Sequence, residues 1–228
     1  MLHRWLKPKS LRTWMPWMMK LSICVCVITL GLGLYWSLLA SPADYQQGDT
    51  VRIMYIHVPA AWMAMMIYSI MAGASGAYLV WRNPVMPLIA EESAPLGAAF
   101  TFMCLVTGSL WGKPMWGTWW VWDARLTSVL VLFFLYIGYL FLVSALRSKE
   151  AYERLTAMLV LIGFVNIPVI KFSVEFWNTL HQPASVIRKG GIAIDTAFLK
   201  PLFTMGIAFM ALYLALLSVR VLRRLRAG

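Results

Sequence analysis

Charged residues are scarce in this 228-residue sequence, and acidic residues are scarcer than basic ones. Only 13% of the residues are charged, about half the share of a typical soluble domain, while 61% are hydrophobic. This composition excludes an ordinary soluble domain and predicts an all-α integral membrane protein. The net charge of +11 is concentrated near the two ends, beside apolar segments. Such residues orient a membrane protein and contact anionic lipid, so we expect membrane lipid, and no nucleic acid, as a partner.

Motifs for redox and nucleotide chemistry are also missing. The three cysteines, Cys24, Cys26 and Cys104, lie in apolar segments and form neither a CxxC nor a CxxCH motif. This disfavours a dithiol, a thiolate metal site and covalent haem attachment. No GxxxxGK[ST] phosphate loop occurs, so any ATP hydrolysis would come from a partner. We expect no catalytic residues and a protein that is not an enzyme.

Long apolar segments dominate what is present. About 20 apolar residues are needed for a helix to cross a bilayer, and six segments qualify. The fifth segment, 155–172, is the weakest candidate because it contains Asn166 and Pro168. A kinked helix inside a bundle could carry both residues. No linker divides the chain, so residues 1–228 are predicted to form one polytopic membrane domain. The predicted spans are 21–40, 58–81, 93–111, 126–146, 155–172 and 201–221.

The distribution of Lys and Arg predicts the orientation of these spans. More of these residues fall inside than outside if the N-terminus is cytoplasmic, and the terminal RVLRRLR is the clearest inner segment. Both termini are then cytoplasmic, and 41–57, 112–125 and 173–200 become external loops. His57 would end the first loop, with Pro59 in the first turn of the next helix, and His181 would lie in the third loop. Glu91 and Glu92 would be solvated charges in an inner loop.

The middle external segment, 111–127, reads WGKPMWGTWWVWDARLT and holds five of the twelve tryptophans. Gly112, Pro114 and Gly117 disfavour a continuous helix through it. Clustered indoles are rigid and apolar, so they suit either an interfacial aromatic belt or a platform for a flat cofactor. His57 and His181 are predicted at the same membrane face as this segment, which favours the cofactor platform, while the aromatic belt stays open as the alternative.

The core of this segment, WGTWWVWDARLTS at 116–128, resembles the WWD signature of haem-handling membrane proteins. The whole chain resembles the haem exporter protein C (CcmC) family of bacterial cytochrome c maturation, and the resemblance extends to the segments around His57 and His181. It implies that these two histidines are the axial ligands of a haem iron. The remaining haem-binding residues would be Trp116, Trp119, Trp120, Trp122, Asp123 and Arg125.

Two neutral imidazoles from separate loops could ligate haem iron from both sides. Arg125, Arg188 or Lys189 could pair with the haem propionates. Asp123 would either hold Arg125 in place or cap the fourth span, and both roles are open.

The resemblance also implies a cellular role. Haem b, bound transiently and without a covalent bond, would be held at the periplasmic face of the bacterial inner membrane and delivered to the haem chaperone CcmE. The ABC transporter subunits CcmA and CcmB and the small membrane subunit CcmD would be the other partners. A membrane b-type cytochrome or quinone-reactive subunit is the alternative, although such proteins usually place histidine pairs inside spans. A transporter subunit with an aromatic belt is a further alternative.

Overall fold

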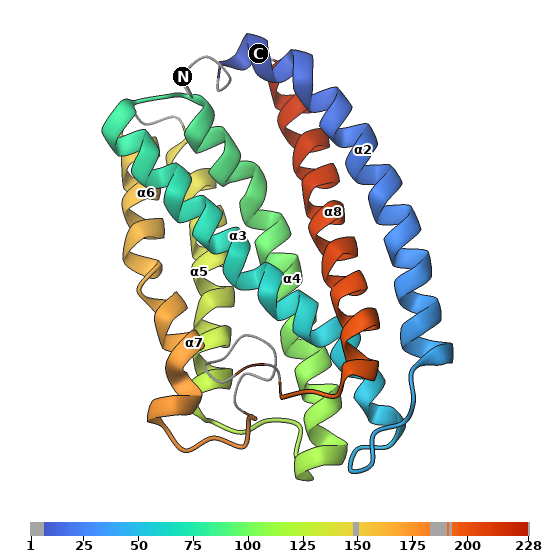
Figure 1. Ribbon diagram of the computed structural model, residues 1–228. Helices are drawn as coiled ribbons and strands as arrows, with labels where there is room; N and C mark the ends of the chain where they lie inside the picture. The colour runs from blue at the N-terminus through green and yellow to red at the C-terminus, as the bar shows by residue number, and fades with distance from the viewer. Residues whose placement is uncertain (1–6, 148–150, 183–190, 192, 228) are drawn as a thin grey trace.

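A computed structural model describes residues 7–147, 151–182, 191 and 193–227, and these residues form an all-helical bundle (Figure 1). In this described part of the chain, six helical segments are long and apolar enough to cross a membrane, which confirms the predicted all-α membrane fold. The helices are α2 (Pro8–Tyr35), continued by η1 (Trp36–Ala40); η2 (Asp49–Ile53), leading into α3 (Met54–Trp81); α4 (Val85–Trp116); α5 (Ala124–Leu146); α6 (Tyr152–Gly163); α7 (Asn166–Phe176); and α8 (Thr196–Ala227).

The start of α2 and the end of α8 lie at the same end of the bundle (Figure 1). We call this the terminal end and the opposite one the outer end. An even number of spans requires this arrangement. That the terminal end is cytoplasmic stays a prediction from the distribution of Lys and Arg.

Several helices are longer than the predicted spans. The first begins at Pro8 instead of residue 21, the third runs over Val85–Trp116 instead of 93–111, and the last reaches Ala227 instead of residue 221. The apolar length of a segment indicates only the part that crosses hydrocarbon. Helices that continue into the polar interface carry charged residues there, so apolar length does not indicate these turns.

The fifth span is interrupted, as its Asn166 and Pro168 indicated. α6 ends at Gly163 and α7 begins at Asn166, whose side-chain amide donates a hydrogen bond of 2.8 Å to the carbonyl of Ser128 in α5. Pro168 lies in the first turn of α7, where its missing N–H removes no helical hydrogen bond. The break between α6 and α7 therefore costs little free energy, and it gives α7, the outer half of this span, a different direction from α6.

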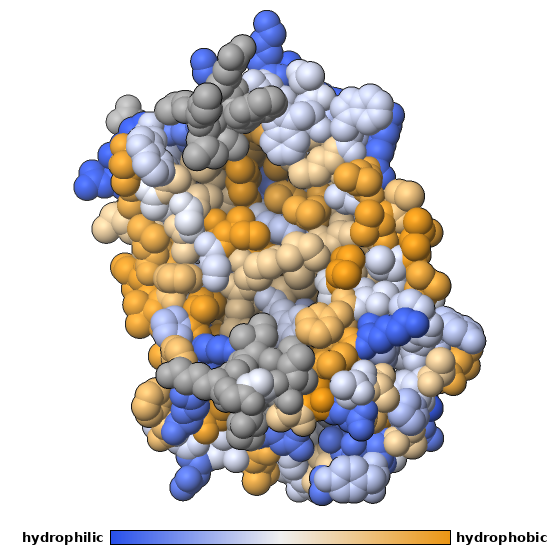
Figure 2. Space-filling view, in the orientation of Figure 1, coloured by the Kyte–Doolittle hydropathy of each residue, from blue (hydrophilic) through white to orange (hydrophobic). Residues whose placement is uncertain are grey.

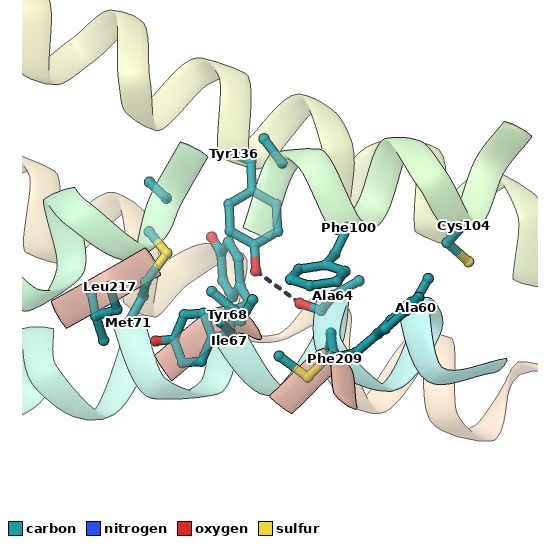
Figure 3. Packing of buried hydrophobic residues seen from close by; sticks show 14 of the residues in the cluster. Ala60, Ala64, Ile67, Tyr68, Met71, Phe100, Cys104, Tyr136, Phe209 and Leu217 are labelled. Atoms are coloured by element: carbon teal, nitrogen blue, oxygen red, sulfur yellow. Dashed lines mark hydrogen bonds between the residues drawn. The ribbon is translucent and has the colours of Figure 1, made fainter. Parts of the chain in front are cut away.

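Tyrosines fill the centre of the bundle (Figure 3). Tyr136 is fully buried and donates a hydrogen bond of 2.8 Å to the carbonyl of Ala64, and Tyr68 packs edge-on against it with ring centres 5.2 Å apart. The two rings fit because glycines face them: a Cβ on Gly97 would lie 2.2 Å from Tyr136, and one on Gly163 would lie 2.1 Å from the Tyr68 hydroxyl. This packing ties α3, α4, α5 and α6 together.

The expectation that Glu91 and Glu92 are solvated loop residues was wrong. Both lie in α4 and are buried, with 8% and 7% of their surface exposed. Glu91 forms ion pairs of 2.9 Å with Arg147 and 3.0 Å with Arg224, and Glu92 pairs with Arg220 at 2.9 Å and Arg224 at 3.1 Å. The partners come from α5 and α8, so a local reading of the sequence could not reveal them.

Replacing Glu91 with Ala should lower the stability of the protein. The change leaves Arg147 and Arg224 without their shared carboxylate, and because both arginines are nearly half exposed we expect a loss of about 2 kcal/mol, less than for a fully buried pair. Asp49→Ala is the matched control, since its pair with Arg52 is exposed and should contribute less than about 1 kcal/mol. Thermal unfolding in detergent measures both, and equal shifts would contradict the assignment.

Candidate functional site

A cavity of about 970 Å³ lies at the outer end of the bundle. Its walls come from α3, α4, α5, α7 and α8 and from the segments that precede α3 and α8. Ligand and cofactor pockets usually measure about 300–1,000 Å³ and combine apolar walls with a few polar groups. Most of the lining here is apolar, and the polar groups include His57, His181 and Arg125.

His57 lies inside a helix, which corrects its expected place at the end of a loop. The turn η2 begins at Asp49 and runs directly into α3, so Pro59 is the sixth residue of α3 and not part of the first turn of the span. Only 9% of the His57 surface is exposed. The helix therefore gives this side chain a rigid base.

Hydrogen bonds to α4 orient the His57 ring. Its Nδ1 lies 3.1 Å from the carbonyl oxygen of Cys104 and 3.1 Å from the hydroxyl of Thr107. A carbonyl only accepts hydrogen bonds, so Nδ1 carries the proton and Nε2 keeps a free lone pair. This arrangement is typical of histidines that bind a metal through Nε2.

Close approach of α4 also depends on Gly108. A Cβ at this position would lie 2.9 Å from Cε1 of His57, closer than real Cβ contacts. Glycine therefore allows the imidazole to lie close to α4, within reach of the Cys104 carbonyl.

His181 faces His57 across the cavity. The ring centres are 6.4 Å apart with an angle of 32° between the planes, and the edge of Trp116 packs on His181 with ring centres at 5.1 Å. Burial lowers the pKa of His181 to about 4, and the nearby His57 and Arg125 act in the same direction. His181 is therefore neutral near pH 7, as a metal ligand must be.

Asp123 connects the start of α5 to the His181 segment. One carboxylate oxygen accepts a hydrogen bond of 2.7 Å from the backbone N–H of Leu126 and so caps α5. The other oxygen accepts from the hydroxyl of Thr179, whose oxygen accepts a 3.1 Å bond from the backbone N–H of His181. Of the two roles left open for Asp123, the structure shows capping, and it adds the link to His181.

Arg125 holds α7 instead of projecting freely into the cavity. Its guanidinium donates to the Ser173 hydroxyl at 3.2 Å and to the carbonyls of Ile170 and Lys171 at 3.3 and 3.4 Å. It still lines the cavity and contributes positive charge there. Arg188 and Lys189, the other expected propionate partners, lie outside the described residues.

The tryptophan segment is helical for longer than expected. α4 continues through Gly112 and Pro114 to Trp116 and ends at Gly117, which adopts a φ of 75°. Glycine is favoured in this left-handed conformation after a helix. Of the three residues expected to interrupt the helix, only Gly117 ends it.

The structure separates the tryptophans into two groups. Trp116 and Trp120 line the cavity, whereas Trp119 and Trp122 do not and are 54% and 76% exposed. The indole N–H of Trp120 is buried and has no hydrogen-bond partner among the described residues. An unsatisfied buried donor of this kind suits a polar group of a ligand.

Trp111 belongs to the site but was not predicted as a binding residue. Its ring packs edge-on against His57 with centres 5.7 Å apart, and its N–H donates a 2.9 Å bond to Gln47. Because α4 is helical here, Trp111 follows Gly108 by three residues on the same face. The expectation of a loop after residue 111 hid this relation.

Two opposed neutral imidazoles are a chemically specific feature. A metal bound at about 2 Å by one nitrogen of each ring would place the ring centres about 6 Å apart, close to the observed separation. No cluster of three or more His, Cys, Asp or Glu side chains that could enclose a metal ion occurs in the described ranges. Two ligands in an apolar, tryptophan-lined cavity therefore fit a metal that a flat organic ring already holds.

Fold and site together define a multi-pass membrane protein with a paired-histidine cavity at one end of the bundle. Residues 1–227 match the family model of heme exporter protein C, and the chain belongs to this family. It is 53% identical to heme exporter protein C of Bradyrhizobium diazoefficiens over 92% of this chain and 80% of that protein. It is 46% identical to heme exporter protein C of Escherichia coli K12 over 96% of this chain and 89% of that protein. A putative cytochrome c biosynthesis ccmC-like mitochondrial protein of Marchantia polymorpha is 48% identical over 82% of this chain and 79% of that protein.

Replacing Asp123 with Ala should cost about 1–2 kcal/mol of unfolding free energy, because α5 loses its cap and Thr179 loses its acceptor. Asp123→Asn should cost less unfolding free energy than Asp123→Ala, because its amide oxygen can still cap α5, although its NH2 group cannot accept from Thr179. Denaturant unfolding in detergent measures both values. If the two variants were equally unstable, the cap on α5 would not contribute to the stability of the protein.

Proposed function

We propose that this protein binds haem b between His57 and His181 and holds it at the periplasmic face of the bacterial inner membrane for delivery to the chaperone CcmE. The observation that carries the proposal is the pair of facing imidazoles, 6.4 Å apart, in an apolar cavity of about 970 Å³. Haem supplies an iron that accepts one imidazole on each side.

Each residue near the pair has a role in this proposal. His57, fixed by the Cys104 carbonyl, presents Nε2 from α3, and His181 presents its ring from the segment between α7 and α8. Trp116 packs on His181, and Trp111 packs on His57. Rings that contact the ligands from the side exclude water from the metal site.

Charge and hydrogen-bond donors support binding of the propionates. Arg125 lines the cavity with a guanidinium that is fixed by α7, and the N–H of Trp120 has no partner among the described residues. A preorganised cation and an unpaired donor favour a carboxylate without further ordering of the side chains.

Release of haem requires an accessible edge and a partner surface. His181 lies outside the spans, so its ligand bond can break without unfolding a helix. Trp119 and Trp122 are exposed at the outer end, where they would contact CcmE. CcmA, with CcmB and CcmD, would supply ATP hydrolysis and complete the export complex.

An electron-transfer cytochrome fits the structure less well. His57 does lie in a span, as in such proteins, but His181 does not, and the sequence contains only one further histidine. Transient haem handling requires one ligand that can move, and this arrangement supports it.

Replacing His57 or His181 with Ala should remove one axial ligand and abolish the low-spin spectrum of the haem-loaded protein. Absorption spectra of the purified variants in detergent measure this change. His3→Ala is the control and should keep the wild-type spectrum. A low-spin spectrum that persists in either His57→Ala or His181→Ala would contradict the ligand assignment.

Gly108→Ala should weaken haem binding by about tenfold, or about 1.4 kcal/mol, because the added Cβ displaces the His57 ring from α4. Gly138→Ala is the matched control in α5, since a Cβ there meets no atom within 4 Å and should leave the affinity unchanged. Titration with haem gives both affinities. Equal affinities would show that the position of the His57 ring does not depend on Gly108.

A further inference from the structure

Several hydroxyl side chains in the membrane-spanning helices share one arrangement. The visible face of the bundle is mostly hydrophobic in its middle, and hydrophilic residues gather toward its two ends (Figure 2). A hydroxyl in this apolar band has little water to bind, so it usually donates to the carbonyl four residues earlier in its own helix. Such bonds, of 2.6 to 2.8 Å, are made by Thr29, Ser69, Thr101 and Ser218. They satisfy the hydroxyl and by themselves indicate no function.

Thr107 in α4 makes the same bond and has a further contact. Its hydroxyl donates to the carbonyl of Met103 at 2.7 Å, and the same oxygen lies 3.1 Å from Nδ1 of His57 in α3. Thr101, six residues earlier in α4, makes the equivalent 2.7 Å bond to Gly97 but no hydrogen bond to a histidine within the described residues. The contact with His57 therefore does not follow from the helical bond alone.

The direction of each hydrogen bond follows from its partners. The Cys104 carbonyl, 3.1 Å from Nδ1 of His57, can only accept, so Nδ1 carries the proton. The Thr107 hydroxyl gives its own proton to Met103 at 2.7 Å, a shorter contact than the 3.3 Å to Cys104, and so it receives the Nδ1 proton through a lone pair. The N–H of the ring is thus shared between two acceptors on α4.

Thr107 lies behind the His57 ring and outside the lining of the cavity, to which His57, Cys104 and Gly108 contribute. Its neighbour Gly108 leaves room for the ring, because a Cβ there would lie 2.9 Å from Cε1 of His57. Glycine provides the space and threonine provides an acceptor. Together the two residues fix the distance of the imidazole from α4 and its rotation.

A second acceptor on Nδ1–H changes the chemistry of the opposite ring nitrogen. Acceptors draw the proton away from the ring, so the imidazole gains negative charge and Nε2 becomes a more basic ligand. A hydroxyl that already donates its own proton is a stronger acceptor, because hydrogen bonds in a chain polarise one another. A more basic axial ligand stabilises ferric haem more than ferrous haem, and hydrogen bonding behind the ligand is one way in which proteins tune haem iron.

We propose that Thr107 is a positioning residue for the haem iron: it holds His57 so that Nε2 is the nitrogen that binds the metal, and it raises the basicity of that nitrogen. This inference rests on the proposed binding of haem by His57 and His181. It extends the site to a residue behind the ligand that neither contacts the cavity nor belongs to the tryptophan segment. A threonine that only satisfies its own hydroxyl would affect stability and leave the iron unchanged.

Thr107→Val tests this role, because valine keeps the shape of threonine and removes the hydroxyl. The full chain in detergent is titrated with ferric haem, and the low-spin spectrum is then followed in a redox titration. We expect about tenfold weaker binding of ferric haem, the lower limit for such partners because the Cys104 carbonyl remains. The preference for ferric over ferrous haem should fall about threefold, which raises the midpoint potential by about 28 mV at 59 mV per factor of ten. Thr107→Ser keeps the hydroxyl and should restore both values.

Thr101→Val is the matched control, since it removes the equivalent hydroxyl from the same helix and should keep the wild-type affinity and potential. Thr107→Ala deletes the same group with a smaller side chain and should give the same rise in potential, so the test does not depend on one variant folding well. Wild-type affinity and potential in the Thr107 variants, or equal shifts in Thr101→Val, would overturn the role of Thr107 and leave the ligand assignment intact. A wild-type protein that forms no low-spin haem would contradict the proposed function itself, and this role with it.

Discussion

The two oxygens of one carboxylate, that of Asp123, fix both the start of α5 and the position of His181. A helix that begins at a membrane interface leaves N–H groups that need acceptors, and Asp123 supplies one through Leu126. Its other oxygen binds Thr179, which holds the backbone of His181. Arg125, two residues further, binds α7. The motif that ends the tryptophan segment is therefore a junction of three parts of the chain.

The two histidines are held in different ways, and this difference suits a ligand that must arrive and leave. His57 is part of α3, and its ring is oriented by α4 through the Cys104 carbonyl. His181 lies between helices, and its backbone N–H donates to Thr179. A fixed ligand can define the position of a metal, while a ligand on a loop can exchange it.

The sequence predicted the six spans because apolar length is a local property, but features that depend on distant residues were missed. Glu91 and Glu92 looked like loop residues since their partners, Arg147, Arg220 and Arg224, lie in other helices. The histidine pair could be predicted from span counting. The place of His57 inside α3 could not, because η2 starts the helix before Pro59. Trp111 was overlooked since α4 was expected to end there. Trp119 and Trp122 lie outside the cavity although Trp120, between them, lines it.

The central claim is that one iron is bound by two imidazoles of this chain, and pulsed electron paramagnetic resonance tests it most directly. The protein is labelled with ¹⁵N in histidine only, loaded with ferric haem, and the nitrogen couplings to the iron are measured. The account predicts a low-spin centre coupled to two ¹⁵N imidazole nitrogens, one from each ring. A centre coupled to a single labelled nitrogen, or to none, would contradict it.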